Sequence, residues 1–176
     1  DKDDSWSFEQ HYNGLLSVTR AGTYARLYTT ERDYRSVSVT VNDFTPTFAA
    51  DGKGNFKMQV YFDFGSAGQF QIRLHNENTN GEYRVQKMAT DLSTGWKNLY
   101  TLNASEVEAL QSEGVEFRVV IAGTNAVAYI NGVQVGVVDL SAGITTETAQ
   151  IKVVMYGNAG VQNIAIPFVL GEGPAL

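Results

Sequence analysis

The fold is decided by the stretch Phe117-Arg-Val-Val-Ile-Ala-Gly-Thr-Asn-Ala-Val-Ala-Tyr-Ile-Asn-Gly-Val-Gln-Val-Gly-Val-Val-Asp139. Its apolar residues recur at alternate positions and not at the three- and four-residue spacing of a helix, which indicates β-strands. We expect three short strands over residues 117–122, 126–130 and 133–138. The last two are joined by Asn131-Gly132, the dipeptide that best supplies the two positive φ angles of a type I′ hairpin turn. The stretch therefore predicts a β-meander with a well-specified register.

The same alternation recurs over the rest of the chain. Further strands are predicted over residues 5–10, 15–19, 23–30, 35–42, 55–64, 68–75, 82–88 and 96–102. Two of these strands bury one face each, through Phe56, Met58, Val60, Phe62, Phe64, Phe70, Ile72 and Leu74. Short strands at this spacing, most with no helix between them, are typical of an all-β protein. We expect an antiparallel two-sheet jelly-roll sandwich.

The opening stretch also resembles a known family. A strand, a Gly-Thr-Asn turn and the hairpin at 129–132 are similar to the late meander of concanavalin A-like, laminin-G-like sandwiches. That family continues into a late glycine-containing strand pair, which residues 150–158 and 161–168 resemble. The resemblance covers about residues 115–169, and before that it depends on strand spacing alone. It implies a lectin-like sandwich of the carbohydrate-binding-module type, although one such sandwich hosts lectins, adhesins and hydrolases.

One short helix is predicted near residues 104–112. Asn103-Ala-Ser-Glu106 matches a capping box, in which Asn103 accepts from the third helical residue and Glu106 reaches back to the cap. Gly114 suits the left-handed position after the helix end. The alternative is that Asn103 is a glycosylation acceptor, because Asn-Ala-Ser has that pattern.

Composition limits the function classes. The chain has 176 residues and a net charge of −6, which disfavours nucleic acid and anionic membranes as partners. It has no cysteine, which excludes thiol chemistry and favours a cytosolic or a bacterial exported protein. No apolar run approaches the ~20 residues of a membrane span. We expect a single domain over 1–170, with 171–176 starting a linker, cut from a longer exported protein.

The catalytic motifs of two sandwich enzyme families are missing. Hydrolases similar to laminarinases place two carboxylates on one strand as Glu-x-Asp-x-x-Glu, about 5–5.5 Å apart. Here Glu31-Arg-Asp33 is followed by Tyr-Arg-Ser and not by a second acid. Residues 71–75 resemble the Gln-Ile-His strand of sandwich alginate lyases, but the partner elements of that family are absent. The prediction from these motifs is that the domain is not an enzyme, although it could be attached to a glycoside hydrolase or lyase.

The outward positions of three predicted strands form a polar platform of amides, guanidinium groups, an imidazole and a tyrosine. Planar amide and guanidinium groups suit the vicinal hydroxyls of sugars, and an aromatic ring suits the apolar face of a pyranose. The predicted ligand-binding residues are Gln59, Tyr61, Gln71, Arg73, His75, Arg84 and Trp96. The alternative is an ordinary solvated sheet face, which must be polar in any soluble sandwich.

A structural calcium ion is a further expectation, since calcium needs hard oxygen ligands in loops. Its candidate ligands are Asp51 and Asn55, in a segment that also reads as a hairpin turn. No cofactor is expected to be required.

The sequence therefore predicts a non-catalytic module that binds an oligo- or polysaccharide, within a secreted or cell-surface bacterial protein that contains other modules. The alternative is a structural or adhesive sandwich that binds a protein partner or spaces neighbouring modules.

Overall fold

The computed structural model describes residues 6–10, 15–20, 24–33, 38–43, 57–76, 82–88, 95–140, 148–156 and 160–165. The first strands are β1 (Trp6–Gln10), β2 (Leu15–Arg20), β3 (Tyr24–Asp33), β4 (Ser38–Asp43), β5 (Lys57–Asp63) and β6 (Gln69–Asn76). The later ones are β7 (Tyr83–Met88), β8 (Trp96–Thr101), β9 (Val115–Ala122), β10 (Asn125–Ile130), β11 (Val133–Asp139), β12 (Thr148–Tyr156) and β13 (Gly160–Ala165). One 3₁₀ turn, Gly65–Ala67, joins β5 to β6, and one α-helix, α1 (Ala104–Glu113), lies between β8 and β9.

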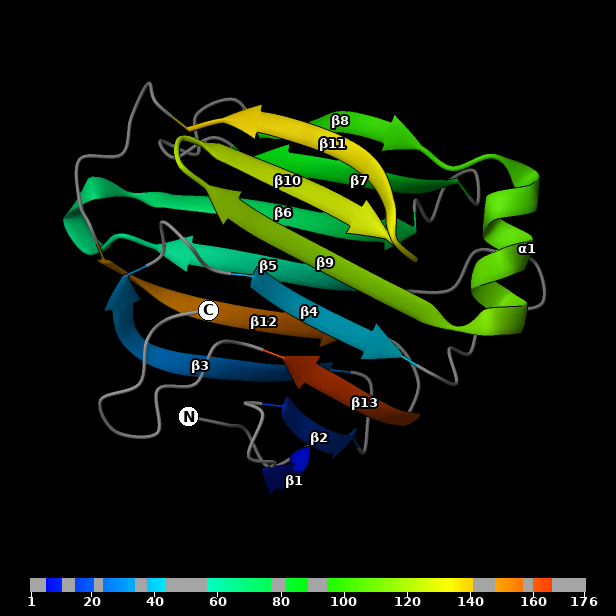
Figure 1. Cartoon of the computed structure of the whole chain (residues 1–176), viewed down its shortest axis with the longest axis horizontal. Helices are drawn as coiled ribbons and strands as arrows, with labels where there is room; N and C mark the ends of the chain where they lie inside the picture. Colours follow the sequence, from blue (N-terminus) through cyan, green and yellow to red (C-terminus); the bar gives the residue numbers. More distant parts are fainter. Residues whose placement is uncertain are drawn as a thin grey trace.

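The strands form two antiparallel sheets that lie face to face (Figure 1). The seven-stranded sheet has the order β1-β2-β13-β4-β9-β10-β11, and the six-stranded sheet has the order β3-β12-β5-β6-β7-β8. Several strands that are neighbours in space are distant in sequence, as in β12 beside both β3 and β5. The predicted all-β sandwich with one short helix is confirmed.

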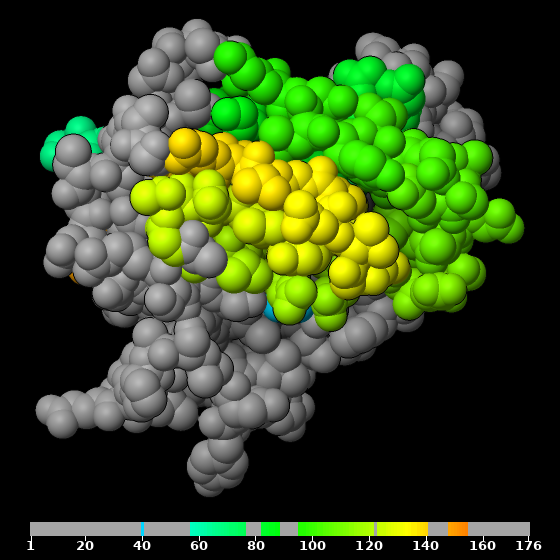
Figure 2. Space-filling view, turned by 45° about the horizontal axis from the view of Figure 1, so that its top comes forward, coloured from blue at the N-terminus to red at the C-terminus, as the bar shows by residue number. Residues whose placement is uncertain are grey.

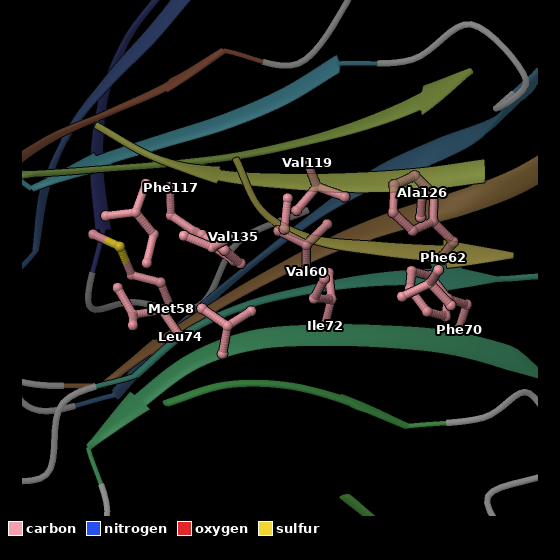
Figure 3. Packing of buried hydrophobic residues seen from close by; sticks show 14 of the residues in the cluster. Met58, Val60, Phe62, Phe70, Ile72, Leu74, Phe117, Val119, Ala126 and Val135 are labelled. Atoms are coloured by element: carbon pink, nitrogen blue, oxygen red, sulfur yellow. The ribbon is translucent and has the colours of Figure 1, made fainter. Parts of the chain in front are cut away.

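The core lies between the two sheets and follows the predicted alternation. Of the eight residues assigned inward on β5, β6 and their flanks, seven are buried, and Phe56 lies outside the described residues. Figure 3 shows Val60, Phe62 and Ile72 of one sheet facing Val119 and Ala126 of the other. This packing sends the alternate, polar positions of β5 and β6 to the outer face of the six-stranded sheet.

The Asn131-Gly132 turn has the predicted geometry, with φ of 46° at Asn131 and 79° at Gly132. The Asn131 side chain also accepts from the Glu116 amide at 2.7 Å and donates to the Gly114 carbonyl at 3.1 Å. The register is less regular than the sequence predicts, because Ala128 pairs with Gly136 while the next residue pairs with Gln134. An extra residue in β11 produces this bulge, which alternation alone does not reveal.

Helix α1 begins with the predicted capping box. The Asn103 side chain accepts from the Glu106 amide at 3.0 Å, and Glu106 accepts from the Asn103 amide at 2.7 Å. Among the described residues no helix is both long and apolar enough to cross a membrane. The predicted linker at 171–176 lies outside the described residues.

Candidate functional site

The outer surface of the six-stranded sheet, called the polar face below, is organised as three rows that cross the strands. Each row consists of residues paired directly across neighbouring strands, which therefore share a face. The aromatic row is Lys152, Tyr61, Gln71, Met88 and Trp96. The central row is Val154, Gln59, Arg73, Gln86 and Asn98. The basic row is Lys57, His75, Arg84 and Thr101.

The structure brings all seven predicted ligand-binding residues together on this face, because each belongs to one of the three rows. Tyr61, Arg73, His75, Arg84 and Trp96 are partly exposed. Their role in binding stays a prediction.

The two predicted glutamines are less open than alternation suggests. Gln59 is 2% exposed and Gln71 is 6% exposed. They form a chain of amides, in which Gln59 Nε2 donates to Gln71 Oε1 at 2.8 Å and Gln71 Nε2 donates to Gln69 Oε1 at 3.0 Å. Buried amides that are hydrogen-bonded in this way hold neighbouring side chains in place.

Arg73 is fixed at the centre of the face. Its Nε and Nη2 donate to Gln86 Oε1 at 3.0 and 2.8 Å, and its guanidinium carbon lies 3.7 Å from the centre of the Trp96 ring. One face of the Trp96 ring is thus covered by a cation, and this contact was not predicted. The Arg73–Gln86 hydrogen bond follows from the direct pairing of these two residues on the neighbouring strands β6 and β7. The predicted strands 68–75 and 82–88 were sufficient to expect this pairing.

His75 sits among positive charges. Burial, followed by the charges of Arg73 and Lys57, lowers the pKa of His75 to about 4. Its buried Nδ1 has no hydrogen-bond partner among the described residues. Burial and the charge of Arg73 also lower the pKa of Lys57. At this end of the face the uncharged forms of His75 and Lys57 are therefore more favourable than they would be in water.

Two carboxylates lie at opposite ends of the polar face. Asp63 accepts from Lys152 Nζ at 2.5 Å and from the Gly65 amide at 2.9 Å. Burial alone would raise the pKa of Asp63, but Lys152 and the Gly65 amide hold it below its usual value. Glu82 forms an ion pair with Arg84, whose Nε donates to it at 2.9 Å.

The calcium prediction is not tested, since Asp51 and Asn55 lie outside the described residues. In the part of the chain that is described, no group of three His, Asp or Glu side chains could hold a metal ion.

A hollow of about 230 Å³ lies between α1 and the β10–β11 hairpin, beside the end of β8. Figure 2 shows this hairpin, in yellow, next to the green surface of α1 and β8. The hollow is lined by Tyr100, Leu102, Glu106, Ala109, Leu110, Glu113, Ile130, Asn131, Val133 and Val135. Tyr100 donates to Glu106 at 2.6 Å, and this bond is the first cause of the raised pKa of Tyr100. Sequence reasoning missed the hollow, because it depends on how the helix packs against the hairpin.

No family model matches the chain, and no curated protein matches it. Among solved structures it is similar to a legume lectin-like domain from Entamoeba histolytica, at a TM-score of 0.55 and 11% identity, over 94% of this chain and 87% of that one. It is also similar to a glycoside hydrolase family 16 (GH16) protein of a Bacteroides ovatus mixed-linkage glucan PUL, which was solved in complex with a G4G4G3G product. That similarity has a TM-score of 0.57 at 12% identity and covers 94% of this chain and 98% of that one. An endo-β-1,3-glucanase from Pyrococcus furiosus has a TM-score of 0.57 and 13% identity, over 92% and 86%. A sialidase also matches at a TM-score of 0.46, and this chain spans 16% of its length.

The prediction of a non-catalytic module, and of no enzyme, is contradicted by the solved structures that are similar over nearly the whole chain, several of which are glycoside hydrolases. The prediction was wrong because the missing Glu-x-Asp-x-x-Glu motif excludes only one arrangement of catalytic carboxylates, the one with both on a single strand. Directly paired residues on adjacent strands have Cβ atoms about 5 Å apart, so two separate strands can also supply the pair of carboxylates.

At 11–13% identity the likeness establishes the architecture and not the activity. The chain has the concanavalin A-like jelly-roll sandwich fold.

Proposed function

We propose that the chain recognises a polysaccharide on the polar face of the six-stranded sheet. The observation that supports this most is the aromatic row, in which Tyr61 and Trp96 lie three strands apart with Gln71 between them. At the usual strand spacing their backbones are about 14 Å apart, which suits a short run of sugar units. The neighbours named for glucans and for a lectin-like domain support the same ligand class.

The exposed and the buried side chains of the polar face would have different roles in binding. Tyr61 and the side of the Trp96 ring opposite Arg73 would stack on sugar rings, since aromatic rings bury the apolar C–H faces of pyranoses. Arg73 would donate to hydroxyls, with Gln86 fixing its plane. The buried amides of Gln59 and Gln71 would act as positioning residues beneath this layer.

The test is binding of a panel of soluble polysaccharides, followed by Tyr61→Ala and Trp96→Ala. We expect each substitution to weaken binding by roughly 1–2 kcal/mol, about ten-fold in Kd, because a stacked sugar face returns to water. Tyr129→Ala is the matched control, since this tyrosine lies under Arg118 on the outer face of the other sheet. Loss of binding in the control alone, or in none of the three variants, would place the ligand elsewhere.

Hydrolysis of the bound chain is a second candidate, favoured by the GH16 neighbours. A glycosidase needs two carboxyl groups about 5–10 Å apart. Asp63 lies beside the start of β6 and Glu82 beside its end, roughly 20 Å away along the strand. These two acids are too far apart to act as a pair, so at least one catalytic acid would be another carboxylate of the chain. Release of reducing ends from mixed-linkage glucan or β-1,3-glucan, in proportion to protein added, is the expected result for hydrolysis; no release from either glucan counts against it.

A further inference from the structure

Three basic side chains, two from the basic row and one from the central row, surround the imidazole of His75. Lys57 on β5 and Arg84 on β7 lie directly opposite His75, one on each side. Directly paired side chains have Cβ atoms about 5 Å apart. Arg73 lies two residues earlier on the same strand and the same face, about 7 Å away. These four residues, Lys57, Arg73, His75 and Arg84, are called the basic cluster.

The positive charge of this region is local. On the part of the polar face formed by β5, β6, β7 and β12 there are four cations, Lys57, Arg73, Arg84 and Lys152, and two carboxylates, which pair with Lys152 and Arg84. The whole chain has the opposite balance, with a net charge of −6. That net charge disfavours polyanions in general, so attraction to one would have to come from a local positive region such as this.

The environment would strengthen binding of an anion. The members of the cluster are partly buried, where charges interact more strongly than in bulk water. Burial and neighbouring charge lower the pKa of both His75 and Lys57, so the cluster resists additional positive charge. A negative group placed over it would oppose both effects. Gln86 holds the plane of the Arg73 guanidinium through Nε and Nη2, and the guanidinium has further N–H donors on its two Nη atoms that suit the oxygens of a carboxylate or a sulfate.

We propose that the basic cluster binds the carboxylate or sulfate groups of an acidic polysaccharide. This inference rests on the proposed function and names its ligand class, since both concern the same face of the sheet.

The experiment compares four probes with the intact chain: polygalacturonate for carboxylates, dextran sulfate for sulfates, and dextran and mixed-linkage glucan as neutral chains. We expect one acidic probe to bind at least about ten-fold more tightly than both neutral ones, with affinity falling as salt rises. The probe that binds identifies the anionic group.

Lys57→Gln should reduce the preference for acidic over neutral chains by about five-fold. Its folding is expected to persist, because burial already disfavours the charge at this position. The matched control is Lys97→Gln, which removes the same charge from an exposed position on β8, paired with Lys87 and off the polar face. A second measurement needs no variant: saturation with the acidic probe should raise the pKa of His75, followed by NMR.

The outcomes separate the two proposals. Binding of a neutral chain with no preference for either acidic probe overturns the acidic ligand and leaves polysaccharide recognition in place. An equal loss of preference in Lys57→Gln and Lys97→Gln overturns the basic cluster as the site. Binding of none of the four probes overturns both proposals.

Discussion

Arg73 shows how one side chain determines the geometry of the polar face. It both stacks on Trp96 and donates twice to a single Gln86 oxygen. Only a planar guanidinium does both, since a lysine ammonium has no flat surface to lay over a ring. Without that contact, Trp96 would lose its fixed orientation at the edge of the sheet.

His75 makes the stability of the domain depend on pH. Its pKa is about 4 in the folded chain, against an ordinary value of 6.5. The groups that face it are Lys57 on β5, Arg73 on β6 and Arg84, with its partner Glu82, beside β7. Since the unfolded chain binds the proton more readily, stability decreases as pH falls below 6.5, until the folded form also protonates near 4. Between pH 7 and pH 5 we expect a loss of about 1–2 kcal/mol from this residue.

The measurement is the free energy of unfolding in denaturant at each pH, for the natural chain and for His75→Gln. Because carboxylates titrate in both proteins, the difference between the two curves isolates this histidine. A difference that does not change from pH 7 to pH 5 would mean that His75 is solvated in the folded protein.

At the scale of the element, the β10–β11 hairpin depends on its turn. Gly132 has a φ of 79°, which a β-branched residue adopts only with strain. No atom lies within 4 Å of a Cβ added there, so the cost of a larger residue comes from the backbone and not from a clash. We expect Gly132→Val to destabilise the domain by about 1–3 kcal/mol, measured by thermal or denaturant unfolding.

Gln134→Val provides the control for this prediction. It introduces the same side chain two residues later, at an exposed position of β11 that has no positive φ. Its effect should remain within about 0.5 kcal/mol. Equal effects of the two substitutions would show that the added side chain, and not the turn, determines the loss.

The elements that the sequence predicts well are those with a local cause. The Asn131-Gly132 turn and the Asn103 capping box depend on a few adjacent residues, and both have the expected geometry. The outward positions of β5 and β6 follow from alternation. What remained hidden depends on neighbours across strands: the bulge in β11, the burial of Gln59, and the cation over Trp96.

At the scale of the whole molecule, the two sheets share one core. Phe117 of β9 is fully buried on the inner face of the seven-stranded sheet. Figure 3 shows it directed toward Met58 and Leu74 of the six-stranded sheet. The polar face is the reverse side of those same strands, so the positions of its side chains depend on contacts made through the core.

This shared core predicts that the two sheets unfold together. Phe117→Ala should destabilise the domain by about 3–5 kcal/mol, because it leaves a cavity between the sheets. Hydrogen exchange should then show an equal loss of protection in the amides of β9 and in those of β5 and β6, as expected for a single cooperative unit. The control is Val137→Ala, at a side chain that is 51% exposed on β11, which should change protection little in either sheet. If β5 and β6 keep their protection while β9 loses it, the six-stranded sheet is stable without its partner, and the polar face is then held by its own hydrogen bonds and not by the core.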